Sequence, residues 1–122
     1  MAFTSTILDT RVTNIIAQET VLTATGQNDI IGGAGALHSV SVANGSGQNA
    51  YLFFYDARSG TLGQTPTLTF MVVAGQTRNY SFPDGILFST GICVRCTNSN
   101  AQNSNTTPTG SPVVGRFIAI RS

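Results

Sequence analysis

Cys93 and Cys96 form a Cys-x-x-Cys motif, the spacing found in redox pairs and in half of a zinc site. The surrounding residues, Ile92–Thr97, have the pattern of a β-strand, in which residues three apart lie on opposite faces and about 10 Å from each other. That separation is too long for a disulfide. Because the chain has no second cysteine pair and a single histidine, we expect reduced, structural cysteines and no metal site.

His38 is the only candidate general base at neutral pH. Nucleophilic catalysis would also require a Ser or Cys beside it and a third group to orient it. Asp56 and Asp84 both lie in turn-like sequences, where Asp usually accepts hydrogen bonds from nearby backbone. We therefore expect His38 to be an exposed or hydrogen-bonded strand residue, and we predict no catalytic residues and no enzymatic activity.

Two other ligand classes, nucleotide phosphates and sugars, have candidate residues in this sequence. The run Gly32-Gly33-Ala34-Gly35 lacks the Gly-Lys-Ser/Thr ending of a P-loop, and a strand rather than a helix is expected to follow it. We predict no cofactor. Asp56 and Asp84 could form the carboxylate pair of a glycosidase if they lay close together. The chain has no Trp for stacking on a sugar, but its three Tyr could partly replace one, so a lectin-like function stays an alternative.

Charge is unusually scarce in this chain. Charged residues make up 9% of it, against about 25% in an ordinary soluble domain. The six bases are all arginine and are scattered, and the formal net charge is +1. A nucleic-acid binder needs clustered Lys and Arg for phosphate contacts, so we predict no nucleic-acid partner.

Length and hydrophobicity indicate one folded domain. A chain of 122 residues with 41% hydrophobic residues can build a single core. Its longest apolar runs are far shorter than the roughly 18 residues needed to span a bilayer. Its first residues lack the basic and apolar regions of a secretory signal. We therefore predict no membrane contact, and synthesis and assembly in a cytosol.

Short segments with period-2 hydrophobicity alternate with turn clusters along the whole chain. The predicted strands are Val12–Ala17, Glu19–Ala24, Leu37–Asn44, Ala50–Asp56, Thr67–Val73, Thr77–Phe82, Ile86–Phe88, Ile92–Thr97 and Val113–Arg121. Ala74-Gly75-Gln76 and Pro83-Asp84-Gly85 are predicted turns. Eight to nine short strands at this spacing predict an all-β fold, an antiparallel β-sandwich of jelly-roll type.

The domain organisation follows from the same pattern. Residues 1–20 are expected to form an N-terminal arm and the first strand, and residues 21–122 a single β-sandwich with a polar loop at 98–112. Phe3, Ile7 and Leu8 are apolar and have no obvious partner strand, which suits an arm that docks on another subunit. The polar loop is either a surface loop or a segment ordered by a neighbouring molecule.

The segment Tyr51–Tyr55 is apolar on both faces, whereas an antiparallel strand commonly has one solvated face. Either its own loops cover the outer face or a second subunit does. Arginine without lysine favours the second possibility, since Arg is enriched and Lys depleted at interfaces. We therefore expect a homo-oligomer, with either Tyr51, Phe53 and Tyr55 or the opposite pair Leu52 and Phe54 at the subunit contact.

Three segments resemble a recurring pattern in small structural proteins of tailed bacteriophages: LHSVSVAN from Leu37, YLFFYDARSG from Tyr51, and VVAGQTRNYSFPDGILFSTGICVRCT from Val72. The resemblance covers about half of the chain. It implies a non-enzymatic virion protein that acts as a trimer or larger ring. Such a protein is either a capsid decoration (cement) protein or a β-sandwich module of a tail or fibre that binds a receptor or glycan. The chain has no long fibrous repeat, which favours the capsid version.

We therefore expect a trimeric decoration protein on the capsid surface, whose partner is the major capsid protein. Phe3, Ile7, Leu8 and Arg11 are the expected contacts to the shell or to a neighbour, and Tyr51, Phe53 and Tyr55 the expected subunit contacts. A self-assembling viral coat is a structural rival, but six scattered arginines give little support for RNA binding.

Overall fold

The computed structural model describes residues 3–9, 14–25, 30–59, 64–101 and 104–121, with side chains described from Ile15 onward. This part of the chain is built from β-strands, and the predicted all-β fold is confirmed. The strands are β1 (Phe3–Asp9), β2 (Asn14–Leu22), β3 (Gly35–Ser46), β4 (Ala50–Asp56), β5 (Leu68–Val72), β6 (Thr77–Phe88), β7 (Ile92–Thr97) and β8 (Gly110–Arg121).

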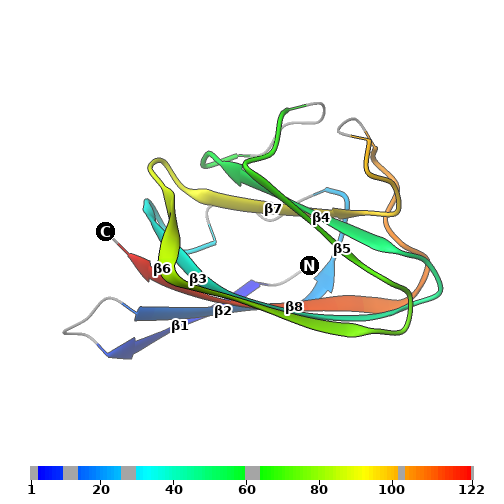
Figure 1. The fold of residues 1–122 in the computed structure, drawn as a ribbon, viewed down its shortest axis with the longest axis horizontal. Helices are drawn as coiled ribbons and strands as arrows, with labels where there is room; N and C mark the ends of the chain where they lie inside the picture. Colours follow the sequence, from blue (N-terminus) through cyan, green and yellow to red (C-terminus); the bar gives the residue numbers. More distant parts are fainter. Residues whose placement is uncertain (1–2, 10–13, 26–29, 60–63, 102–103, 122) are drawn as a thin grey trace.

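The strands form two antiparallel sheets that face each other (Figure 1). The large sheet has the order β1-β2-β8-β3-β6, and the small sheet has the order β5-β4-β7. Side chains from the facing surfaces fill the space between them, as in other sandwiches. The predicted β-sandwich is therefore present.

The pairing pattern is that of one long hairpin rolled up on itself. β4 pairs with β5, β3 with β6, and β2 with β8. Between the last two pairs, two described residues of the segment 23–34 bond β7: the Cys96 amide donates to Thr23 O (3.0 Å) and the Ile30 amide to Ile92 O (3.0 Å). Rolling the hairpin adds the β3–β8 and β4–β7 pairs. This nested order is the jelly-roll topology that the sequence predicts.

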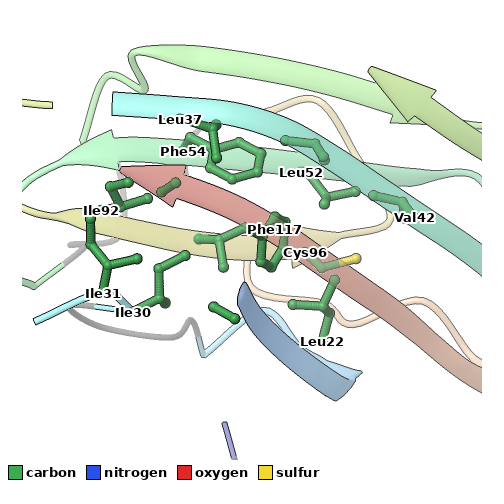
Figure 2. Packing of buried hydrophobic residues seen from close by; sticks show 14 of the residues in the cluster. Leu22, Ile30, Ile31, Leu37, Val42, Leu52, Phe54, Ile92, Cys96 and Phe117 are labelled. Carbon is green, nitrogen blue, oxygen red and sulfur yellow. The ribbon is translucent and has the colours of Figure 1, made fainter. Parts of the chain in front are cut away.

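The core lies between the sheets and is centred on Phe54 of β4 (Figure 2). Its ring makes edge-on contacts with Phe70 (5.7 Å between centroids) and Phe117 (5.5 Å), the preferred geometry for aromatic pairs. Ile30 and Ile31 of the segment 23–34 close one side of this core. Each fully buried Phe stabilises the fold by about 1.5–3 kcal/mol. The alternation predicted for Thr67–Val73 is present, with Leu68 and Phe70 packed on the core.

Pro83-Asp84-Gly85 was predicted to be a turn between two strands, but it is a bulge inside the single strand β6. Leu37 pairs with Ile86 and Ser39 with Ser81, so four residues of β6 loop out opposite one of β3. Gly85 has φ +76°, and a Cβ there would lie 2.8 Å from Nε2 of His38. Only glycine fits this conformation and this contact easily. The turn-forming residues therefore bend one strand instead of joining two.

The first ten residues also differ from expectation. Phe3–Asp9 lies in the large sheet as β1 and pairs with β2 over Phe3 to Ile7, with a register shift before Asp9. The partner strand that the sequence did not reveal is therefore β2. The two predicted strands Val12–Ala17 and Glu19–Ala24 are one continuous strand, so the proposed boundary at residue 20 falls inside β2.

Glu19 is the most unusual side chain of the core. It follows Ile15 and Ala17 on the inner face of β2 and is 0% exposed. Within the described residues, neither carboxylate oxygen has a hydrogen bond of good geometry. Desolvation by burial raises the pKa of Glu19, and the nearby Val21 amide only partly opposes this shift. A buried carboxylate without a partner favours its neutral form.

Replacing Glu19 by Gln should stabilise the protein at neutral pH. The raised pKa means that the native state holds the proton after the unfolded chain has lost it. Stability therefore falls as the pH rises through the native pKa. Glu19→Gln has no such loss and should gain on the order of 1 kcal/mol at pH 7. Urea denaturation between about pH 4 and pH 7 tests this, and an equal difference at both ends of the range would contradict it.

Candidate functional site

Of the residues with catalytic potential, His38 and Asp56 make hydrogen bonds within the fold. Nδ1 of His38 lies 3.1 Å from the carbonyl oxygen of Phe82, beside the β6 bulge. This confirms the expected hydrogen-bonded strand histidine. Asp84 is exposed on the same bulge.

Asp56 ends β4 and organises the turn between β6 and β7. Its Oδ2 accepts hydrogen bonds from the Ser89 amide (3.0 Å) and hydroxyl (2.9 Å), and its Oδ1 accepts one from the Thr90 amide (2.8 Å). Burial alone would raise the pKa of Asp56, but these bonds and the Gly91 amide outweigh it and hold the pKa below its usual value. The sequence predicted that Asp56 bonds nearby backbone in its own turn. The turn that it stabilises instead includes Ser89, 33 residues further along the chain.

The two cysteines lie on opposite faces of β7, as their spacing predicts, and neither forms a disulfide. Cys96 is part of the central core, where burial raises the pKa of its thiol to about 12. Cys93 belongs to a second cluster on the outer face of the small sheet, and its Sγ donates to Ala57 O (3.1 Å). Both are structural side chains.

Nothing in the described ranges forms a ligand site of the usual kinds. These residues contain no pocket and no group of three His, Cys, Asp or Glu that could hold a metal ion. They also contain no helix long and apolar enough to cross a membrane. The candidate site must therefore be sought on the surface.

The outer face of the small sheet is buried within the chain itself. Phe53 is 1% exposed and Tyr55 0%, and both cluster with Cys93. Arg95, the pairing partner of Phe53, lies among them, also buried. Its Nε donates to Ala24 O (2.8 Å), one terminal nitrogen to the Tyr55 hydroxyl (3.0 Å), and the other to Ser104 O.

Arg95 thus joins two segments that are far apart in the sequence. Ala24 follows β2 closely, and Ser104 lies in the polar loop. The same two segments also bond each other, since the Ala24 amide donates to the Thr107 hydroxyl (2.9 Å). The described part of the loop is therefore ordered by its own chain, which neither of our two alternatives for it anticipated.

This arrangement decides between the two explanations of the aromatic strand. Its own loops cover the outer face, while Leu52 and Phe54 are buried in the core. Phe53 and Tyr55 therefore offer no surface to a neighbour, and of the three expected subunit contacts only Tyr51 is half-exposed. Strand β4 therefore gives no support to the expected homo-oligomer.

The most exposed large apolar side chain, Leu87, lies on the large sheet, while Met71 and Val73 are exposed at the small sheet. Pairing sets Leu87, Ala36 and Ile120 side by side across β6, β3 and β8, and Ile118 beside Ile16 of β2. Leu87 is 67% exposed and Ile120 41%, and the other three are half-buried. We call these five residues the outer apolar patch. Exposed patches of this kind mark interaction sites.

The patch was missed from the sequence, although a signal was present. Ile15-Ile16 and the run Phe117–Ile120 are apolar at successive positions, which means on both faces of a strand. Of the other expected contacts, Phe3, Ile7 and Leu8 lie in β1, whose side chains are outside the described part. Arg11 is not among the described residues.

Comparison with known proteins adds no relative: no family model, curated protein or solved structure matches this chain. The candidate functional site is therefore the outer apolar patch. It is an apolar sheet surface with Arg116 exposed two residues before Ile118 on the same face of β8, and such a surface suits contact with another protein.

Replacing Arg95 by Met should loosen the outer cover of the small sheet. The change keeps much of the side-chain volume but leaves the Ala24, Tyr55 and Ser104 oxygens without their donor. We expect a loss of about 3 kcal/mol in the free energy of unfolding and faster proteolysis within 98–112. Tyr55→Phe removes a single bond and should cost only about 1 kcal/mol. Equal losses for the two variants, measured by urea denaturation, would contradict this role.

Replacing Asp56 by Asn should weaken the β6–β7 turn in a pH-dependent way. The lowered pKa means that Asp56 stabilises the fold above its unfolded-state value, about 3.9, and that this stabilisation is lost as the pH falls through the native pKa. We expect a cost of about 1–2 kcal/mol at pH 7 that shrinks in acid. Asp84→Asn is the matched control, because it removes the same charge at an exposed site. Thermal denaturation across pH would show parallel curves if Asp56 had no such role.

Proposed function

We propose that this protein is a non-enzymatic decoration protein of a tailed-bacteriophage capsid, and that the outer apolar patch is its contact with the major capsid protein. The observation that carries the proposal is the position of the patch on the outside of the large sheet. This is a rigid surface, since β3 and β8 beneath it pair along most of their length.

The segments that resemble phage structural proteins support this proposal, because they run from β3 to β7. They include Leu37 of β3, next to Ala36 of the patch, and Leu87 of β6, its most exposed member. The resemblance therefore includes both the frame of the sandwich and part of the proposed contact surface.

The mechanism is mechanical. Each copy binds across a junction between neighbouring shell subunits and adds buried interface there. The shell then resists the outward pressure of packaged DNA. The stabilisation grows with the number of contacts that one bound particle makes, since linked contacts bind with higher avidity than single ones. The trimer that the resemblance implies stays a prediction, and strand β4 gives it no support because its own chain covers Phe53 and Tyr55.

Leu87→Asp should weaken attachment to shells without unfolding the protein. The side chain is largely exposed, so its replacement leaves the core intact, whereas a charge in the contact must lose its water. We expect at least a tenfold loss of affinity, about 1.4 kcal/mol, in co-sedimentation with expanded, DNA-free shells of the phage that encodes the chain.

The control is Met71→Asp, because Met71 is 45% exposed but lies on the small sheet. It should bind shells like the unchanged protein. The reverse order of the two variants would place the contact on the small sheet. If the unchanged protein binds no shells but binds a glycan array, the alternative applies: a tail- or fibre-associated module that recognises a receptor.

A further inference from the structure

The described sandwich has four open sides where a sheet ends, and three of them are protected. An unprotected edge strand pairs readily with another strand, and proteins prevent this with bulges, prolines, charges or covers. The edge at β6 carries the Pro83 bulge and the exposed Arg78. The edge at β7 is covered by the segment 23–34 through the bonds at Thr23 and Ile30.

The edge at β5 is short and partly capped. The strand has five residues, and the Tyr80 hydroxyl of β6 bonds the Met71 carbonyl (3.4 Å). The Phe70 ring stacks on Tyr80 (4.4 Å between centroids) and so ties this edge to the large sheet. A further strand could not easily be added here.

Over residues 3–7 the fourth edge, β1, has no proline, no charge and no register shift, because its register shift and its one charge lie at its Asp9 end. It stands at the end of the large sheet, bonded on one side by β2 (Figure 1). Its sequence, Phe-Thr-Ser-Thr-Ile-Leu-Asp, contains no proline and no basic residue, and its one charge is the final Asp9. The register with β2 runs without a break from Phe3 to Ile7. A regular five-residue ladder is therefore presented on its free side.

We propose that β1 pairs antiparallel with β1 of a second copy across a twofold axis at Ser5. An antiparallel strand pair about a twofold axis is self-complementary, so each copy presents the same surface to the other. In this register Phe3 lies opposite Ile7 of the second copy, Thr4 opposite Thr6, and Ser5 opposite Ser5.

The residue types match this register. Aromatic with β-branched and Thr with Thr are among the favourable cross-strand pairs, and no like charges meet. The polarity pattern Phe-Thr-Ser-Thr-Ile reads the same in both directions, which is what self-pairing requires. In the register with β2, Phe3 is the partner of Glu19 and Ile7 is the partner of Ile15. Pairing of the two copies extends the large sheet into one continuous sheet.

The dimer is independent of shell binding and is measured in solution without shells. Light scattering over a concentration series should approach twice the 12.8 kDa mass of the chain. A monomer at all concentrations overturns the proposal. A trimer also overturns it, because a threefold assembly cannot contain this twofold pairing.

Charge variants on the Thr4–Thr6 pair test the register. Thr4→Lys/Thr6→Lys places like charges opposite each other and should shift the dissociation constant at least about tenfold toward monomer. Thr4→Lys/Thr6→Glu changes the same two positions but places opposite charges across the axis, so the dimer should persist. Circular dichroism checks that both variants fold. Equal dimerisation of the two overturns the proposed register.

A cysteine at the axis gives a second, covalent readout. Residues directly opposite in an antiparallel pair have Cα atoms about 4.5–5.5 Å apart, within the range of a disulfide. Ser5→Cys should therefore cross-link two copies under mild oxidation, whereas Thr4→Cys, which lies opposite Thr6, should not. Cys93 and Cys96 are buried and do not compete. Cross-linking of Thr4→Cys but not of Ser5→Cys would place the axis elsewhere and overturn the proposal.

Discussion

Strand β4 buries apolar side chains on both of its faces, and the rest of the molecule is arranged to make this possible. On the inner face, Phe54 packs edge-on against rings from β5 and β8. On the outer face, Phe53 and Tyr55 need a cover that a three-stranded sheet cannot supply. Ala57 packs against the cluster that they form with Cys93, and buried Arg95 bonds Ala24 and Ser104 beside it.

This arrangement moves the functional question from the small sheet to the large one. The small sheet is sealed by its own chain. The large sheet shows the outer apolar patch on its outside and the bare strand β1 at its end. These two features do not compete for the same residues. One lies on the face of the sheet and the other at its edge, so a copy paired through β1 still presents its patch.

The protected edges show how the sandwich limits association. A bulge at Pro83, a cap from Tyr80 and a covering segment along β7 each block a different route to strand addition. Over Phe3–Ile7, β1 carries no such feature, and its register shift and its one charge lie at its Asp9 end. Because the other three edges are protected, the unprotected run of β1 indicates strand pairing more strongly than it would in a sheet with no protected edge. This contrast motivates our proposal of pairing between copies.

The sequence by itself determined the features that depend on local backbone geometry. Period-2 alternation placed Leu68, Phe70 and Val72 on one face, separated Cys93 from Cys96, and identified the all-β jelly-roll class, because a strand's side-chain directions depend only on its own backbone. Tertiary structure decided the partners. Arg95 meets Ala24 across 71 residues and Asp56 meets Thr90 across 34, and β1 finds β2. Such contacts depend on how the hairpin rolls up. Burial of Tyr55, or exposure of Leu87, was therefore set by the neighbour that the fold brought to each strand face.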